Sequence, residues 1–573
     1  MFSRRDILKF IAVGGSASLL PFSYNKYLKR FGINQAFADG GVQSPPLTPF
    51  LDPLPLPSEI EPVKPFDAPD WEEFIGETTR FYKIVAEERY VQFHSQLPQP
   101  TSIWGYRPNN VPHGEWNFAL GPTLIANASQ HIKDGMIVQH LNNLPIEHQG
   151  FGHPELSVHL HGGHHPSRSD GFPGNIDGFQ PFTFGPGEHY TYSYPMAAPG
   201  LMDGAAEYSE IPSTLWYHDH AEDFTAANVY KGLAGFHLVY EDATTDGALD
   251  IGDESSPRGL HLPSGDYDIP IFLQDKTFLD DGSLFYNPFD HDGFLGDTYV
   301  INGKVQPYFN VKRRKYRFRL LNGSNARFYH VSLTNENGRE QPFDMIATDG
   351  GLLSRTLRDK TSFLIAMAER FEIVVDFSKY NTGDVLYFED RLEQDDGRGP
   401  KGKFDSPKLR NLGTRFLKFI VGEEAVDMSE VPDMLRPFEP ISDNVLAQAT
   451  VKTFEFERRH GAWQINHQFF DRNQALAESH LGEPEIWRLV NKSGGWWHPI
   501  HIHSEFGRVI RRNGKLPPLH ERDGIAKKDT FILGPNDEVE IFLKFRDFTG
   551  PFVFHCHTLE HEDMFMMGRF DVV

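Results

Sequence analysis

Val553-Phe554-His555-Cys556-His557, with the loop from Thr558 to Met566 behind it, contains the single cysteine of the chain. Side chains alternate between the two faces of a β-strand, so His555 and His557 project to one side and Cys556 to the other. The sequence therefore predicts two adjoining metal sites that share one short piece of backbone.

The cysteine side has the ligand types of an electron-transfer copper. Such sites hold the ion between two histidines and a cysteine, with a weakly bound axial methionine. His561 and Met566 follow Cys556 closely in the chain, and His498 lies just ahead of another histidine pair. These three residues can complete the ligand set of Cys556.

The histidine side belongs to a larger set of H-x-H pairs. Neutral imidazoles suit copper or zinc, but a structural zinc site takes about four ligands and usually more cysteine. One pair alone would be read as polar side chains on an exposed strand face, whereas four pairs beside a thiolate favour a multinuclear redox centre. The pairs are His159/His161, His218/His220, His501/His503 and His555/His557.

Short β-rich runs between turn signals predict an all-β chain of the sandwich or barrel type, because long helical periodicities are scarce. A chain of 573 residues suggests about three domains. Acidic, Gly- and Ser-rich sequence at 241–265 and 423–442 marks the joints. The clearest predicted strands are 81–86, 316–321, 371–377 and 539–545.

Two further segments lack strand patterns. Residues 39–65 are rich in proline and predict an extended arm that lies over the body of the protein. Residues 390–410 are rich in Asp, Gly and Lys, which predicts a mobile surface loop inside the second domain.

The N-terminus predicts export. Ser3-Arg4-Arg5-Asp6 precedes a mildly apolar run and the A-x-A site Ala36-Phe37-Ala38, so residues 1–38 are expected to be a twin-arginine signal peptide. The apolar run is shorter than the ~20 residues of a membrane-spanning helix, which argues against a lasting membrane anchor. The expected partner is the twin-arginine export machinery, and the expected location is periplasmic or extracellular.

Charge and cysteine content exclude other classes. The net charge is −24, and without residues 1–38 the chain keeps 49 basic and 78 acidic side chains, a net charge near −29. Nucleic-acid binding is therefore not expected. The first interpretation of this negative charge is that it keeps the protein soluble. The second is that it mildly attracts cationic donors or metal ions. With one Cys, no internal disulfide can form.

In their order along the chain, the four histidine clusters resemble the four copper motifs of the multicopper oxidases. Gly121-Pro122-Thr123-Leu124, Ala368-Glu369-Arg370 and Lys528-Asp529-Thr530 add to the resemblance, which covers almost the whole chain. Spore-coat laccases and bilirubin oxidases are the most similar subgroup. The resemblance implies three cupredoxin-like Greek-key β-sandwiches, with domains at 39–245, 264–422 and 445–573 and the three-copper cluster between the first and the third.

The resemblance also implies a role for each ligand and four coppers per chain. The type 1 copper, in the third domain, would be held by His498, Cys556, His561 and axial Met566. The type 2 copper would be held by His159 and His501. The type 3 pair would be held by His161, His218 and His557 on one ion and by His220, His503 and His555 on the other.

Electrons would then enter through His498, whose ring lies near the surface in such enzymes, and pass through Cys556 to the cluster. Glu562 and Asp170 would supply protons, although each could equally fix a loop or orient a ligand. Trp496 lies two residues before His498, as a tryptophan does in bilirubin oxidases, and could stack on an aromatic donor. Trp497 is expected to be packing.

The predicted function is therefore a laccase-like oxidase that takes single electrons from a small phenolic, aromatic amine or tetrapyrrole donor and reduces O₂ to water. A monomer is expected. An oxidase acting on Mn(II), Cu(I) or Fe(II) is the first alternative, although only 11 Met occur and cuprous oxidases usually carry a Met-rich insert. A non-enzymatic cupredoxin scaffold and a nitrite reductase fit the complete ligand set less well.

Overall fold

A computed structural model describes residues 42–573 apart from 149, 180, 246 and 460. The predicted signal peptide at 1–38 lies outside the described residues. Among the described helices, none combines the length and the apolar character that crossing a membrane requires. Within this part of the chain the strands form three sandwiches, here called N-terminal, central and C-terminal, and the predicted all-β class is confirmed.

The N-terminal sandwich packs two mixed sheets against each other. Strands β1 and β4 pair in parallel, as do β3 and β8, and the other neighbours are antiparallel. One sheet has the order β2-β1-β4-β6, formed by Thr101–Pro108, Arg80–Val91, Met136–Asn143 and His189–Tyr194. The other has the order β3-β8-β7-β5, formed by Leu124–Ala128, Ala234–Glu241, Thr214–Asp219 and Val158–His161.

The central sandwich is the largest of the three. Its first sheet has the order β12-β11-β9-β14-β19-β16-β17, with β10 beside β9, formed by Lys304–Val305, Thr298–Ile301, Asp268–Phe278, Lys315–Asn322, Arg370–Asp376, Phe343–Thr348, Gly351–Lys360 and Leu284–Phe285. Its second sheet has the order β13-β23-β20-β15-β18, formed by Tyr308–Arg313, Leu409–Glu424, Val385–Leu392, Tyr329–Asn335 and Ser362–Ile365.

The C-terminal sandwich carries the thiolate motif. One sheet has the order β25-β24-β27-β31-β29, formed by Ala462–Ile465, Thr450–Arg459, Pro484–Asn491, Glu538–Lys544 and Arg508–Arg512. The other has the order β26-β33-β32-β28-β30, formed by Ala475–Ser479, Met567–Val572, Gly550–Cys556, His498–Ile502 and Thr530–Leu533. The predicted strands at 316–321, 371–377 and 539–545 match β14, β19 and β31 to within one residue at each end, and the one at 81–86 lies inside β1, which runs five residues further.

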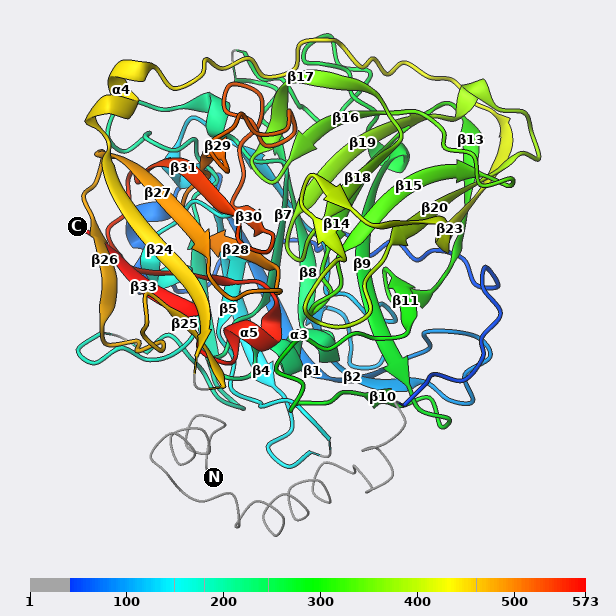
Figure 1. The fold of residues 1–573 in the computed structure, drawn as a ribbon, viewed down its shortest axis with the longest axis horizontal. Coiled ribbons are helices and arrows are strands. Elements are labelled where there is room, and N and C mark those ends of the chain that lie inside the picture. The colour runs from blue at the N-terminus through cyan, green and yellow to red at the C-terminus, as the bar shows by residue number, and fades with distance from the viewer. Residues whose placement is uncertain (1–41, 149, 180, 246, 460) are drawn as a thin grey trace.

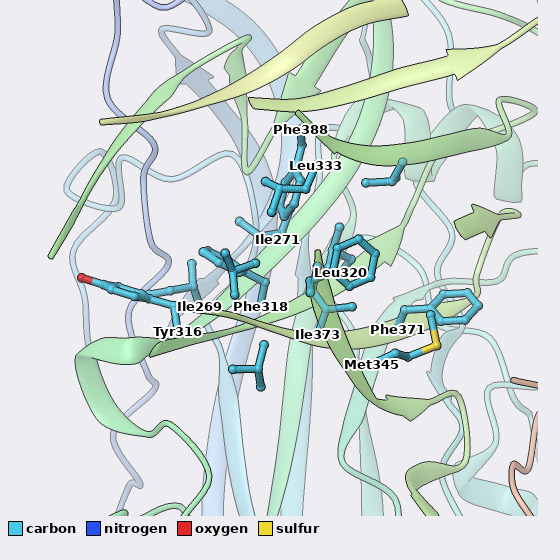
Figure 2. Packing of buried hydrophobic residues seen from close by; sticks show 14 of the residues in the cluster. Ile269, Ile271, Tyr316, Phe318, Leu320, Leu333, Met345, Phe371, Ile373 and Phe388 are labelled. Carbon is cyan, nitrogen blue, oxygen red and sulfur yellow. The ribbon is translucent and has the colours of Figure 1, made fainter. Parts of the chain in front are cut away.

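Apolar side chains from both sheets fill each sandwich, as alternating strands require. Figure 2 shows this in the central sandwich, where Ile271 and Phe318 of one sheet meet Leu333 and Phe388 of the other. The N-terminal and C-terminal sandwiches have equivalent cores. In Figure 1 the C-terminal sandwich stands beside the central one, with N-terminal strands between them.

Helices are short and few among the described residues. The α-helices are α3 (Thr225–Lys231), α4 (Asp443–Gln448) and α5 (Leu559–Glu562). The 3₁₀ turns are η3 (Pro69–Phe74), η4 (Ile132–Asp134), η5 (Ser167–Ser169), η6 (Tyr208–Glu210), η7 (Gly265–Tyr267) and η8 (Phe377–Lys379). Helix α5 contacts α3, which joins the end of the chain to the N-terminal sandwich.

The two irregular segments differ from one another. The described part of the proline-rich arm is extended, as predicted, and bridges Pro53 to Tyr308 and Val63 to Phe81. The segment 390–410, predicted as a mobile loop, instead contains the small sheet β21-β22 (Gly402–Lys403 and Ser406–Pro407) and packs on the C-terminal sandwich. The backbone N–H of Trp497 donates to the Arg398 carbonyl at 2.8 Å. The loop prediction missed this hydrogen bond, because it joins residues far apart in the chain.

Candidate metal centre

Strands β28 and β32 create two sites back to back. Their antiparallel register pairs Ile500 with Cys556 and His501 with His555. Because neighbouring positions face opposite sides of a sheet, Cys556 and His498 face one side, and His501 and His555 face the other. One pair of strands thus divides the ligands between a thiolate site and a histidine cluster.

The thiolate site has the dimensions of a trigonal metal site. Cys556 Sγ lies 3.5 Å from Nδ1 of His498 and 3.5 Å from Nδ1 of His561, and the two nitrogens are 3.2 Å apart. Ligand atoms bound ~2.0–2.3 Å from one ion in a plane are separated by roughly 3.5 Å, so the three atoms fit one metal. All three residues are fully buried.

The loop that carries Met566 is closed by backbone hydrogen bonds. The Met566 N–H donates to the His561 carbonyl at 3.0 Å, and the Cys556 N–H donates to the Met566 carbonyl at 3.0 Å. Phe565 has a φ of 79°, a left-handed conformation that costs an ordinary residue about 1–3 kcal/mol. The turn is held against this strain, and it keeps Met566 buried in the same apolar cluster as Cys556.

The His498 ring, expected near the surface, is not itself exposed and lies beneath the turn that contains Ser493. His498 is 0% exposed, and burial lowers its pKa to about 3, which keeps the imidazole neutral. Its Nε2 lies 2.7 Å from Ser493 Oγ. Ser493 itself is buried, and its neighbours Lys492 and Gly494 are exposed. The sequence could not show this cover because it depends on how a turn folds back.

The eight remaining histidines converge between the N-terminal and C-terminal sandwiches. Strands β5 and β7 pair His159 with His218, while His501 and His555 pair across β28 and β32. The two sets approach each other directly. Nε2 of His159 is 3.4 Å from Nε2 of His501, and Nε2 of His555 is 3.1 Å from Nε2 of His220 and 3.2 Å from Nε2 of His503.

Hydrogen bonds to the backbone fix which nitrogen each ring presents. Nδ1 of His159 donates to the Asp170 carbonyl at 2.6 Å, Nδ1 of His218 to the Asp219 carbonyl at 2.9 Å, and Nδ1 of His501 to the Asp529 carbonyl at 3.0 Å. A ring that donates from Nδ1 in its neutral tautomer has a free lone pair on Nε2. These bonds therefore aim three lone pairs into the cluster.

Several ring nitrogens in the cluster are buried with no protein partner. They are Nδ1 of His161, Nε2 of His218, Nδ1 of His220 and both nitrogens of His557. The His557 ring lies 5.2 Å from that of His161 and 5.5 Å from that of His218. Burial lowers the pKa of all four imidazoles, to about 3 for His220, so they are neutral. Buried neutral imidazoles without hydrogen bonds fit bound metal, and the ligand types fit copper.

The two acids predicted at the cluster are both there. Asp170 Oδ2 accepts from Nδ1 of His503 at 2.7 Å, so Asp170 orients two ligands, His503 by its side chain and His159 by its carbonyl. Glu562 Oε2 lies 3.0 Å from His555 Nδ1 and Oε1 lies 3.7 Å from His220 Nε2. Burial alone would raise the pKa of Glu562, but His555 and His220 lower it to about 2.

Asp529 and Arg370 support the cluster and were not predicted as site residues. Arg370 donates to both carboxylate oxygens of Asp529 at 2.7 Å. The Asp529 carboxylate also lies 3.3 Å from Nε2 of His161, and its carbonyl holds His501. Both residues occur in motifs that the sequence offers only as family matches, and nothing in the sequence pairs one with the other.

The thiolate site is lined by Trp463, which sequence reasoning also missed. Its ring lies 4.1 Å from that of His561 and 5.2 Å from that of His498. The central sandwich takes part as well, because the Asp292 carbonyl accepts from His561 Nε2 at 3.1 Å and the His291 carbonyl accepts from Trp463 Nε1 at 3.1 Å. A tryptophan in an ordinary strand pattern carries no signal of this role.

The two tryptophans ahead of His498 lie in different surroundings. Trp496 is half-buried, with its ring 5.5 Å from that of Trp463. Trp497 is 1% exposed and packs against Phe328 of the central sandwich, 5.7 Å between ring centroids. Trp497 is therefore core, whereas Trp496 lies at the outer edge of the thiolate site.

Comparisons with known proteins agree with this geometry. A family model described as multicopper oxidase matches residues 440–573. The chain is 33% identical to a laccase of Bacillus stratosphericus over 92% of this chain and 99% of the laccase, and 33% identical to a bilirubin oxidase of Albifimbria verrucaria over 72% and 67%. The crystal structure of the McoA multicopper oxidase from Aquifex aeolicus superposes with a TM-score of 0.70 at 26% identity, covering 91% of this chain and 99% of that one.

Proposed function

Because the chain belongs to the multicopper oxidase family, and is thus a copper-dependent oxidoreductase with O₂ as acceptor, we propose that it works as a laccase. It would take single electrons from phenolic, aromatic amine or tetrapyrrole donors at the thiolate site and use four of them to reduce O₂ to water. The small-molecule donor and O₂ are its reactants.

The observation that carries the proposal is the shared backbone of the two sites. Cys556 Sγ belongs to the thiolate site, while the residues on either side of it, His555 and His557, belong to the histidine cluster. An electron that reaches the cysteine is then separated from the cluster by a few covalent bonds. Donor and O₂ never need to meet, which allows loose donor specificity.

Four coppers are proposed, distributed as the family resemblance implies. Buried sets of ligand atoms support the groups His498/Cys556/His561, with Met566 as axial ligand, and His220/His503/His555. The 3.4 Å separation of His159 and His501 supports their pairing, and the unpartnered nitrogens support His161/His218/His557. When bound, copper supplies one-electron redox chemistry at the thiolate and O₂ binding at the cluster.

This chain's own residues prepare the sites for that chemistry. Burial raises the pKa of the Cys556 thiol, so the thiolate is formed only when a metal replaces its proton. Glu562, ionised and within 3.0 Å of His555, is proposed to carry protons to the cluster. Asp170 is proposed to do so as well, although its hydrogen bond to His503 gives it an orienting role in any case.

The alternatives are less well supported. Buried groups of His and Cys ligand atoms, together with membership of an enzyme family, argue against the scaffold hypothesis. A metal oxidase fits the family, but Met564, Met566 and Met567 near the thiolate are all buried and could not receive Cu(I) from solvent. We also propose the domain limits 39–245, 264–422 and 445–573, export by the twin-arginine route to the periplasm or beyond, and a monomeric enzyme.

The test is anaerobic stopped-flow absorbance on copper-loaded protein. The enzyme is reduced with a phenolic donor and then mixed with O₂, beside the Cys556→Ser variant. A blue band that bleaches with the donor and returns with O₂, and that is missing in the variant, is the expected result. Loaded protein that shows no blue band, or takes up no O₂, would refute the laccase proposal.

A further inference from the structure

Trp496 is the outermost ring of an aromatic pair that leads to the thiolate site. It is half-buried and meets the edge of Trp463 at 78°, with 5.5 Å between ring centroids. Trp463 in turn lies 4.1 Å from the His561 ring. His498 itself is fully buried, and a donor that touches Trp496 would be connected to the His561 ring through Trp463.

Two arginines lie over Trp496, and they are not equivalent. The guanidinium carbons of Arg398 and Arg458 are 4.9 and 5.0 Å from the centre of the Trp496 ring. Arg458 is only 28% exposed and is bonded to the Asp292 carboxylate. It is therefore already neutralised and mainly holds the two sandwiches together.

Arg398, by contrast, has donors to spare. Its side chain is 56% exposed, and the nearest carboxylates, Asp396 and Asp292, are 3.8 and 4.0 Å away. These distances exceed those of N–H···O hydrogen bonds, about 2.7–3.2 Å. An arginine fixed by stacking on an aromatic ring is well placed to bind a carboxylate in bidentate fashion.

The turn that precedes Trp496 in the chain is open to solvent. Gly494 and Gly495 are exposed, and a Cβ added at either would meet nothing within 4 Å. Gly494 has a φ of 79°, which explains a glycine there, but the backbone of Gly495 requires none. The same turn contains Ser493, whose Oγ lies 2.7 Å from His498 Nε2, so the open space at the glycines lies close to a ligand of the thiolate site.

We propose that Trp496, Arg398 and Gly495 form a donor subsite that selects aromatic donors bearing a carboxylate. The donor ring would lie on Trp496 over the two glycines, and its carboxylate would bind Arg398. A phenol bound in this way loses one electron to the thiolate site and its proton to solvent, as in the oxidation already proposed. The subsite rests on that proposed function and adds a substrate class to it.

The negative charge of the whole chain would not by itself favour a donor that bears a carboxylate. A chain with a net charge of −24 repels anions in general, so selection for a carboxylate needs a local cation. Asp396, 59% exposed, competes with the donor for Arg398. Removal of the Arg398 charge and removal of the Asp396 charge should therefore change carboxylate binding in opposite directions.

The experiment compares syringate with methyl syringate, which share a ring and differ in charge. Steady-state kinetics on the copper-loaded enzyme should show that Arg398→Gln raises the KM for syringate roughly tenfold and leaves methyl syringate unchanged, as expected for loss of a charge-assisted hydrogen bond. Asp396→Asn should lower the KM for syringate about two- to threefold. The control is Arg511→Gln on β29. The Arg511 side chain is 60% exposed and lies 3.9 Å from Glu540, and its replacement should change the KM of neither donor.

A second readout does not depend on turnover. Binding of 3,4,5-trimethoxybenzoate, which lacks the oxidisable phenol, is measured by calorimetry on the same holoenzymes and should weaken in Arg398→Gln and strengthen in Asp396→Asn. Equal effects of Arg398→Gln on both syringates, or the same effect from Arg511→Gln, would overturn the subsite. If neither donor were oxidised by the parent enzyme, the proposed function would fail, while the binding measurement would still decide the subsite.

Discussion

The thiolate site and the histidine cluster share a strand but depend on different parts of the fold. His498, Cys556 and His561 all belong to the C-terminal sandwich, so the register of β28 on β32 is nearly enough to assemble them. The cluster takes four histidines from the N-terminal sandwich and four from the C-terminal one, each on a strand or directly after its end. The thiolate site therefore needs only the correct pairing of two strands, whereas the histidine cluster needs the N-terminal and C-terminal sandwiches to pack correctly on each other. Variants that disturb only the contact between these sandwiches should damage the cluster and leave the thiolate site intact.

Asp529→Asn should show the largest difference between damage to the cluster and damage to the thiolate site. The change removes the carboxylate that pairs with both Arg370 nitrogens and leaves only Asp349, 3.9 Å away, which costs up to about 3–5 kcal/mol and weakens the orientation of His161. We expect copper to be lost from the cluster and O₂ reduction to fall roughly 100-fold or more, while the blue band of the thiolate site persists. Copper analysis, absorbance and O₂ uptake measure the three effects.

The matched control for this variant is Asp376→Asn in the central sandwich, where the aspartate lies 3.8 Å from exposed Lys379. It should leave copper content and O₂ uptake intact. Loss of the blue band together with the cluster copper in Asp529→Asn would mean that the two sites do not assemble separately.

Glu562→Gln tests the cluster without disturbing its assembly. A glutamine keeps the shape next to His555 but cannot carry a proton, so reoxidation by O₂ should slow roughly 10- to 100-fold. Reduction of the blue band by the donor under anaerobic conditions should not change. Glu560→Gln is the control, because this neighbouring buried acid bonds to Asn325 instead. Equal slowing in both variants would point to a general disturbance of α5.

The comparison also explains what the sequence can and cannot predict. Alternation along β32 separates Cys556 from His555 by a rule that needs no tertiary information, and the H-x-H pairs mark the remaining ligands. The supports of those ligands are long-range contacts. Asp529 with Arg370 and the Asp292 carbonyl with His561 join segments more than a hundred residues apart, and no local pattern announces them. For the same reason the sequence did not predict the turn that covers His498 or the small sheet in the 390–410 segment.

Trp463→Phe sharpens the claim that the thiolate site is local. The indole N–H bond to the His291 carbonyl links this site to the central sandwich, and phenylalanine keeps a ring near His561 but loses that bond. We expect a shifted blue absorption and a few-fold fall in kcat/KM for donors, with the spectrum of the cluster unchanged. Trp487→Phe, in the C-terminal core against Phe454, is the control and should leave the blue band in place. An unchanged spectrum in Trp463→Phe would show that the central sandwich has no influence on this site.

His164→Gln addresses the junction itself and should have the smallest effect. His164 belongs to the N-terminal part of the chain, and its Nε2 lies 2.8 Å from Asp547 and its Nδ1 lies 3.7 Å from Glu505. Burial would lower the pKa of His164, but Glu505 and Asp547 together raise it above its usual value. Stability that depends on a raised histidine pKa is fully present below the unfolded value of about 6.5 and is lost as the pH rises through the folded value.

Glutamine keeps a hydrogen-bond donor at position 164 but never carries the charge. The thermal midpoint of His164→Gln should therefore fall below that of the parent by the equivalent of about 1 kcal/mol near pH 5.5, and the gap should narrow by about pH 8.5. Exposed His189→Gln is the control and should show no such pH dependence. A gap of constant size across this range would mean that the junction is held by the shape of the His164 ring and not by its charge, and that pH does not regulate the contact between the two sandwiches.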